Sequence, residues 1–213
     1  MKLTYYWIFT TRPQSFLSPR ECAYSVLRLR RLRLWEFTSR DGRKIVVRHA
    51  MPEDARHMHD GFCAVVEEGK WLPTLTPNGT ISDWISWIHR ARTSRNVLLV
   101  AEIDEQYVGH LSLQPEEWDA SQHVASLGLI VMKGYRGIGV GRSLMHVAEE
   151  VAIENEFEKI ILSTFSSNEK ARRLYESLGY ELVGIRRRHF KMFGAYVDEA
   201  LYEKHLSPEM GSH

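Results

Sequence analysis

Cysteine is scarce in this chain of 213 residues: it has two, Cys22 and Cys63, and neither belongs to a Cys-x-x-Cys pair. This scarcity argues against a disulfide-stabilised fold and a cysteine-built zinc site, and it favours a reducing compartment. Long hydrophobic runs are missing too, since no stretch approaches the roughly 20 apolar residues that cross a bilayer. The short apolar start is followed by polar residues, which argues against a signal peptide. We therefore expect a cytoplasmic protein with no membrane partner.

A strong net charge is also missing, because the formal total is +1. That total averages two opposite regions: residues 1–44 carry a net +7 and residues 45–213 a net −6. The boundary lies at Asp41-Gly42, a dipeptide typical of turns. We expect a basic extension of unknown role over residues 1–43, one domain over residues 44–206, and a tail over residues 207–213 that resembles an expression-tag remnant.

The basic extension alternates charged and apolar residues, as in Leu27-Arg28-Leu29-Arg30. A basic face of this kind can bind nucleic acid or an anionic surface. Arginines on a solvated edge strand have another use, because they discourage edge-to-edge association. We favour the edge strand and do not expect a nucleic-acid partner.

From residue 44 onward, apolar residues recur at strand or helix spacing. The pattern predicts one strand, two helices, three strands, a helix, a strand, a helix and two final strands. Their apolar residues fall within residues 45–47, 55–66, 81–88, 97–103, 107–113, 124–132, 144–152, 160–162, 171–178, 182–185 and 197–201. This order predicts an α/β domain whose mixed, mostly antiparallel central sheet is flanked by helices.

A glycine-rich loop, Arg136-Gly137-Ile138-Gly139-Val140-Gly141, follows the strand at 124–132 and opens a long helix. Glycines let backbone N–H groups converge, and a helix N-terminus adds unpaired donors and a positive dipole end, so the loop can cradle a pyrophosphate. No Lys follows the glycines, as a nucleoside-triphosphate loop requires, and the spacing is not that of the dinucleotide fingerprint. The pattern [R/Q]-x-x-G-x-[G/A] is matched in full; a tight turn without a ligand is the alternative.

A second block, residues 168–180, reads Asn-x-x-Ala-x-x-Leu-Tyr-x-x-x-Gly-Tyr. With both blocks in this order, residues 44–206 resemble the GCN5-related N-acetyltransferases (GNAT). The resemblance implies a GNAT-like fold and acetyl-CoA as co-substrate, with no metal. It also implies direct transfer of acetyl from the thioester to a primary amine.

The resemblance assigns roles to particular residues. Backbone groups of Leu129, Ile130 and Val131 would hold the pantetheine arm beside a strand splayed from its neighbour, and Asn168 would contact the cofactor or cap its helix. Tyr175 would be the catalytic acid that protonates the departing thiolate, although its helical spacing also fits a core tyrosine. The pyrophosphate would be held by Arg136, Gly137, Ile138, Gly139, Val140, Gly141 and Arg142.

The general base stays open. GNAT relatives often carry a carboxylate on the fourth or fifth strand, and the comparable segments here, residues 125–127 and 162–165, have none. Glu102, His110, His123 or a water chain remain as candidates. His57 and His59 do not share a helix face, which argues against a metal site there.

The acceptor is also open: a small amine, an amino acid or a protein amino group. Its walls are expected from Trp71, Leu72, Leu75, Phe190, Phe193 and Tyr196. A homodimer is compatible with the sequence. The alternative function is a non-catalytic acyl-CoA sensor or scaffold with a basic N-terminal interaction arm.

Overall fold

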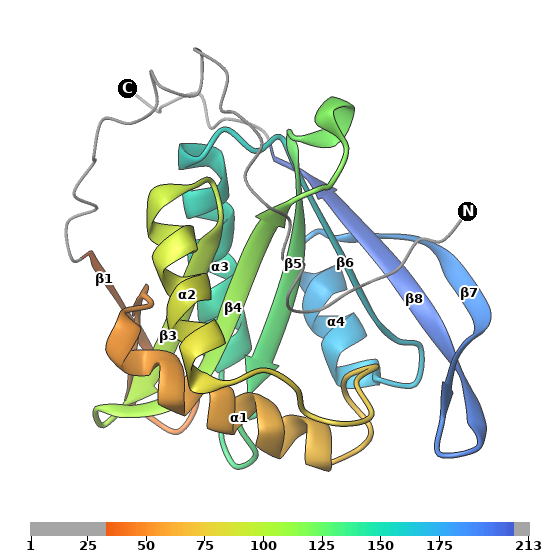
Figure 1. Ribbon diagram of the computed structural model, residues 1–213, viewed down its shortest axis with the longest axis horizontal. Helices are drawn as coiled ribbons and strands as arrows, with labels where there is room; N and C mark the ends of the chain where they lie inside the picture. The colour runs from red at the N-terminus through yellow and green to blue at the C-terminus, as the bar shows by residue number, and fades with distance from the viewer. Residues whose placement is uncertain (1–32, 207–213) are drawn as a thin grey trace.

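The computed structural model describes residues 33–206, so the expectations for residues 1–32 and for the tail lie outside the described residues. Figure 1 shows one sheet with helices on both of its faces. The strands are β1 Leu34–Thr38, β2 Lys44–His49, β3 Val97–Ile103, β4 Gln106–Pro115, β5 Val124–Val131, β6 Lys159–Phe165, β7 Glu181–Met192 and β8 Ala195–His205. The α-helices are α1 Ala55–Glu67, α2 Ile81–Thr93, α3 Val140–Glu154 and α4 Glu169–Ser177, and short 3-10 turns cover Pro52–Asp54 and Asp119–Ser121.

The sheet has the order β1-β2-β3-β4-β5-β6-β8-β7. All of its described neighbours pair antiparallel except β5 and β6. The mixed, mostly antiparallel sheet flanked by helices is therefore confirmed. None of the described helices is both long and apolar enough to cross a membrane.

The sheet begins earlier than residue 44, because β1 pairs with β2 from Leu34↔Arg48 to Thr38↔Lys44. Trp35 and Phe37 alternate toward the core and pack against it, while their neighbours face outward. The boundary expected at residue 44 therefore falls inside a hairpin of the sheet. Strand β1 lies at one edge of the sheet, whereas the alternating segment at residues 27–30 lies outside the described residues.

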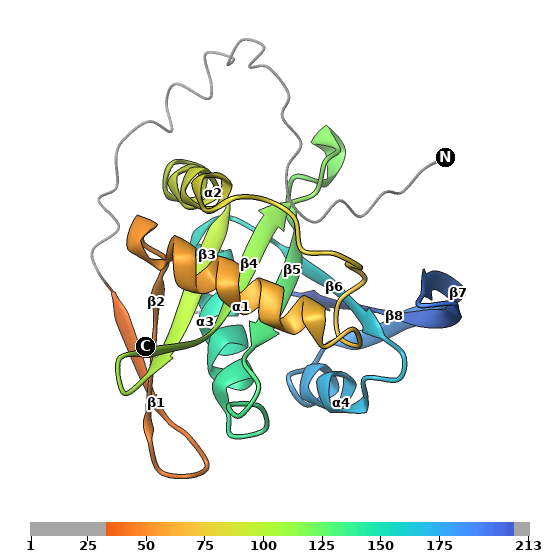
Figure 2. The ribbon, with the colours of Figure 1, turned by 60° about the horizontal axis from the view of Figure 1, so that its bottom comes forward.

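Two apolar layers hold the helices on the sheet. One layer joins α3 and α4 to one face through buried residues such as Leu144, Met145 and Tyr175. The other joins α1 and α2 to the opposite face through Phe62 and Trp84. Figure 2 shows α1 and α2 in front of the sheet, with α3 and α4 on the other side.

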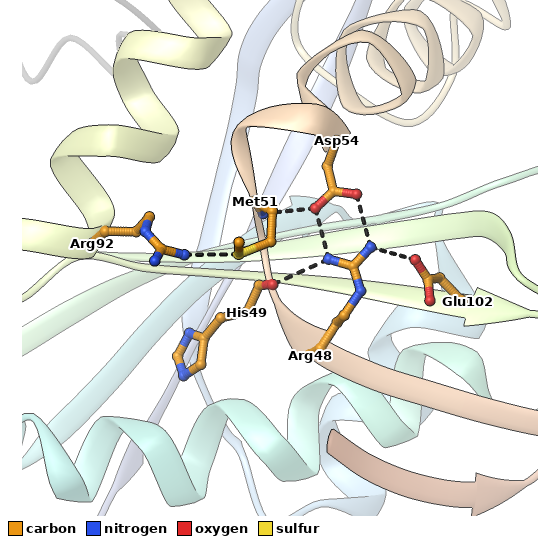
Figure 3. Close-up of polar contacts among 6 residues, drawn as sticks. All are labelled: Arg48, His49, Met51, Asp54, Arg92 and Glu102. Carbon is orange, nitrogen blue, oxygen red and sulfur yellow. Dashed lines mark hydrogen bonds and ion pairs between the residues drawn. The ribbon is translucent and has the colours of Figure 1, made fainter. Parts of the chain in front are cut away.

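A charged cluster fixes the start of α1 against the sheet (Figure 3). Arg48 of β2 donates to both oxygens of Asp54, at 2.7 and 2.9 Å, and forms an ion pair with Glu102 of β3. Asp54 Oδ2 also accepts the Met51 N–H at 2.7 Å. The cluster thereby sets the direction of α1, whose far end leads into the functional site.

Candidate active site

A cavity of about 1310 Å³ lies where β5 and β6 separate. These two strands pair only from Val124↔Lys159 to Ser126↔Ile161. Beyond that point both strands continue, so their edges diverge and leave backbone and side chains of both lining the cavity. Leu129, Ile130 and Val131 lie on this diverging part of β5, as predicted, and all three line the cavity.

The glycine loop forms one end of the cavity. Gly137 and Gly139 have φ values of +80° and +117°, in the region that only glycine enters without strain. Gly139 is the N-cap of α3, and no side chain among residues 33–206 caps this helix. Because the first intrahelical bond is Ser143 N–H to Gly139 C=O, the N–H groups at positions 140–142 have no helical partner. The loop therefore presents unpaired donors and the positive end of a helix dipole.

Of the other predicted loop residues, three line the cavity and one is buried in the core. Ile138, Gly141 and Arg142 line the cavity, and Arg142 donates to Ser177 Oγ at 2.7 Å. The Val140 side chain is buried in the core with 1% exposure, so only its backbone can meet a ligand.

Arg136 lines the cavity, and its guanidinium is bound by protein partners. It donates to both oxygens of Glu68, at 2.7 and 2.6 Å, and its Nε donates to Val131 C=O at 2.8 Å. Its charge also lies 5.1 Å from the centre of the Trp71 ring. The sequence carries no signal for this arrangement, because Glu68 is distant along the chain.

Arg40 is a cavity residue that the sequence pattern does not single out. It lies in the turn after β1, where its backbone N–H donates to Ile138 C=O at 2.8 Å. Its guanidinium donates to Gly137 C=O at 3.4 Å. Three other basic side chains, Arg142, Lys170 and Arg173, line the same cavity, so this part of its wall is basic.

Tyr175 and Asn168 both line the cavity from the α4 side. Tyr175 is 6% exposed and also packs in the core, so a place in the core and a place in the cavity wall are compatible for this residue. Burial raises the pKa of the Tyr175 hydroxyl to about 12, which keeps it protonated at neutral pH. Asn168 caps α4, since its side-chain oxygen accepts the Ala171 N–H at 3.3 Å.

The residues proposed as bases lie away from the cavity. Glu102 is bound to Arg48, and His123 lies at the far end of β5 beyond its pairing with β6. His110 is buried with 3% exposure beside the Tyr107 hydroxyl, and burial lowers its pKa to about 3. None of the three lines the cavity. In the described part of the chain, no three His, Cys, Asp or Glu side chains gather as metal ligands.

Two carboxylates of β8 line the cavity: Glu203, which is paired with Lys159, and Glu199, which is 1% exposed. The sequence offers a signal for it, because Glu199 stands between Val197 and Leu201 on one face of a strand, where an apolar residue is expected. The resemblance directs attention to residues 125–127 of β5 and 162–165 of β6, and Glu199 lies outside both segments, in β8.

The acceptor walls are partly as expected. Trp71, Leu72 and Phe190 line the cavity, together with Pro73. Leu75, Phe193 and Tyr196 are exposed instead, at 54%, 72% and 52%. The Phe193 ring lies against Gly69, where an added Cβ would meet it at 3.1 Å. The β7–β8 hairpin therefore touches the loop between α1 and α2.

Comparison with known proteins decides the family, because the profile of the acetyltransferase (GNAT) family matches residues 30–180. The chain belongs to the GNAT family. Among curated relatives, the L-amino acid N-acetyltransferase AaaT of Escherichia coli is 32% identical over 102 residues, or 47% of this chain and 62% of that protein. The chain thus spans less than two thirds of that relative's length.

Solved structures carry the same GNAT fold. The structure of yncA from Salmonella typhimurium with acetyl-CoA has a TM-score of 0.73 and 17% identity, over 79% of this chain and 98% of that one. The ribosomal-protein-alanine N-acetyltransferase of Brucella melitensis has a TM-score of 0.69 and 26% identity, over 75% and 99%. The fold and family inferred from the two sequence blocks are confirmed.

Proposed function

We propose that this GNAT protein is an acetyl-CoA-dependent N-acetyltransferase that transfers acetyl directly to the primary amine of a small acceptor. The observation that carries the proposal is the continuous cavity that joins the uncapped N-terminus of α3 to Tyr175. Single small ligands usually occupy about 300–1,000 Å³, and this cavity of about 1310 Å³ exceeds that range. Its size suits an elongated cofactor together with an acceptor.

The cavity residues fit acetyl-CoA. The N–H groups at positions 140–142 and the basic side chains of Arg40 and Arg142 would hold its phosphates. The unpaired edge of β5 at Leu129–Val131 offers backbone groups to an extended pantetheine arm. Bound there, acetyl-CoA supplies an acetyl group activated as a thioester.

Tyr175 holds a proton that the reaction needs. Its hydroxyl is protonated at neutral pH because burial raises its pKa to about 12. A coenzyme thiolate that leaves within the cavity can therefore take its proton from a hydroxyl that is still protonated at neutral pH. This makes Tyr175 the proposed catalytic acid.

A small acceptor is favoured over a protein chain because the α1–α2 loop and the β7–β8 hairpin meet beside the acceptor end. Trp71, Leu72 and Pro73 approach from the α1–α2 loop, and Phe193 of the β7–β8 hairpin lies against Gly69. A free amino acid is the first candidate, because AaaT is named for that activity. Arg186, which lines the same wall, is compatible with an acceptor carboxylate.

The proposal is tested by thiol release from acetyl-CoA with three groups of acceptors: free L-amino acids, peptides with N-terminal alanine, and polyamines. We expect turnover with one or more amino acids and slower or no turnover with peptides. Turnover with peptides alone would replace the small acceptor by a protein amine. Tight coenzyme A binding without turnover on any amine would instead favour the acyl-CoA sensor. The cytoplasmic location and the homodimer stay predictions; light scattering tests the latter.

A further inference from the structure

Glu199 is a buried carboxylate in the wall of the cavity, in the middle of β8. Its register partners are Phe165 of β6 and Arg186 of β7. Phe165 and Arg186 also line the cavity, as do Tyr175 and the diverging end of β5. Glu199 therefore lines the same cavity as the proposed acid and the strand edge proposed to hold the cofactor arm.

The two oxygens of Glu199 differ in their surroundings. Oε2 lies 3.1 Å from Arg186 Nη1 and 3.4 Å from His189 Nε2. Oε1 is buried and has no hydrogen-bond partner among the described residues. One oxygen thus anchors the carboxylate while the other is left unsatisfied.

A bulge in β7 allows two of its residues to contact the Glu199 carboxylate. Between the pairs Arg186↔Glu199 and Phe190↔Val197, residues 187–189 stand opposite the single residue Asp198. Arg188 adopts a positive φ of 51°, and its N–H donates to Asp198 Oδ1 at 2.6 Å. The bulge lets both Arg186 and His189 reach the same carboxylate from one strand.

An unsatisfied buried acceptor costs about 1–3 kcal/mol, so folded proteins rarely keep one without a use. Arg186 and His189 stabilise a charged carboxylate at this depth, while Phe165 on the β6 side brings no charge. The partner that Oε1 lacks is a donor. Glu199 lines the cavity, so a rotation of its carboxylate would present Oε1, which has almost no accessible surface of its own, to an amine bound there.

We propose that Glu199 binds the acceptor amine through Oε1 and takes its proton, an inference that rests on the acetyltransferase function proposed above. The amine nitrogen forms the bond to the acetyl carbon while the carbon–sulfur bond breaks. Glu199 takes the proton that frees the lone pair of the bound ammonium, the second proton that the nitrogen loses on forming the amide goes to solvent, and the departing sulfur takes the proton of Tyr175. Exchange with solvent then restores both groups, so the overall reaction yields an amide and a free thiol.

This assignment supplies the base that residues 125–127 of β5 and 162–165 of β6 lack. It also gives the acceptor a chemical class: a primary amine small enough to reach a carboxylate beneath the hairpin. The positive charge of Arg186 beside that carboxylate fits an acceptor that carries an anionic group as well as its amine. A zwitterionic amino acid satisfies both conditions.

The test is the Glu199→Gln variant, which keeps the side-chain size and removes the ability to take a proton. We expect kcat/KM for the best amine to fall by roughly 100-fold or more, in line with general base catalysis. A base works only when deprotonated, so the pH profile of the wild-type rate should carry an ascending limb. The variant should lose that limb of the pH profile.

Binding gives a readout independent of turnover. In calorimetry, the Glu199→Gln variant should bind coenzyme A within about 2-fold of wild type, while acceptor binding to the coenzyme A complex should weaken by roughly 10-fold, as loss of a charge-assisted hydrogen bond predicts. The matched control is Glu149→Gln, which removes the charge of a carboxylate paired with Lys204 at 2.7 Å outside the cavity. That control should keep the wild-type pH profile and acceptor affinity.

Glu199→Asp provides a second variant that keeps the carboxylate if the amide variant does not fold. It should retain the pH limb with a reduced kcat. A folded Glu199→Gln protein within about 3-fold of wild type and with an unchanged pH profile would overturn the proposal, as would an aspartate variant without the limb. Absence of turnover by the wild type on every amine would instead contradict the function itself.

Discussion

Arg136 and Glu68 form a two-point ion pair, with Arg136 Nη1 2.7 Å from Glu68 Oε2 and Nη2 2.6 Å from Oε1. Glu68 follows the end of α1, and Arg136 follows β5. The same carboxylate accepts the Trp71 Nε1–H at 2.6 Å, and Arg136 also donates to Val131 C=O. The pair therefore links the α1–α2 loop, which lines the proposed acceptor end, to β5, which lines the proposed cofactor end.

This ion pair predicts a pH dependence of stability. Hydrogen bonds from Arg136, and then from Trp71, lower the pKa of Glu68 from 4.5 to about 2. A carboxyl whose pKa is lowered by folding contributes stability above its unfolded pKa and loses it as the pH falls toward its folded pKa. Wild-type stability should therefore decline between pH 4.5 and 2. Glu68→Gln should cost roughly 1–3 kcal/mol at pH 7 and flatten that decline.

Chemical denaturation across pH checks this expectation. Glu169→Gln is the control, because it removes a carboxylate from a pair with Arg173 in which both side chains are about 70% exposed. Exposed pairs contribute about 0–1 kcal/mol. Equal losses in the two variants would contradict the special role of Glu68.

Tyr175→Phe tests the catalytic acid. The change removes a hydroxyl that lines the cavity and leaves the ring in the core. We expect kcat to fall by roughly 100-fold with little change in coenzyme A affinity. Tyr180→Phe is the matched control, since Tyr180 is 3% exposed and lies outside the cavity. Full activity of the Tyr175 variant would remove the acid assignment.

Gly137→Ala tests the phosphate loop. Gly137 and Gly134 have φ values of +80° and +93°, and an added Cβ would meet nothing within 4 Å at either position. Both alanine variants should therefore lose about 1 kcal/mol of stability through backbone strain. Only Gly137 lines the cavity, so only its variant should bind coenzyme A more weakly in calorimetry. Equal affinities would place the phosphates elsewhere.

Arg40→Ala tests the basic end of the cavity. Loss of a charge-assisted contact to phosphate should weaken coenzyme A binding by roughly 10-fold. Pantetheine lacks the phosphates, and its affinity should not change. Arg43→Ala, in the same turn but paired with Asp41 at 2.6 Å and outside the cavity, serves as the control. A similar loss for pantetheine would assign Arg40 a role in loop structure alone.

Arg48→Met tests the cluster beneath α1. Removing the cation leaves Asp54 and Glu102 uncompensated, and their side chains are only 11% and 23% exposed. Breaking a buried charge network costs about 3 kcal/mol. We expect that loss in denaturant unfolding at pH 7, with the activity per folded molecule unchanged. A stable variant would show that helix packing alone holds α1.

The sequence by itself determined the order of elements from residue 44 onward, the mostly antiparallel sheet and the family. Apolar periodicity and the two motifs depend only on residues that are close together along the chain. The glycine loop and Tyr175 lie within those motifs, and both line the cavity. Strand β1 was not predicted, because the charge step and the Asp-Gly turn favoured a domain boundary where the structure has the β1–β2 hairpin.

Only the tertiary structure decided what the charged residues do. Arg136 lies in the predicted loop, but its partner Glu68 comes from a helix end far along the chain. Glu102 and Glu199 are both strand carboxylates, and packing makes one a partner of Arg48 and places the other in the cavity wall. Ionic contacts form across the fold between residues that share no local pattern, so spacing along the chain cannot assign them.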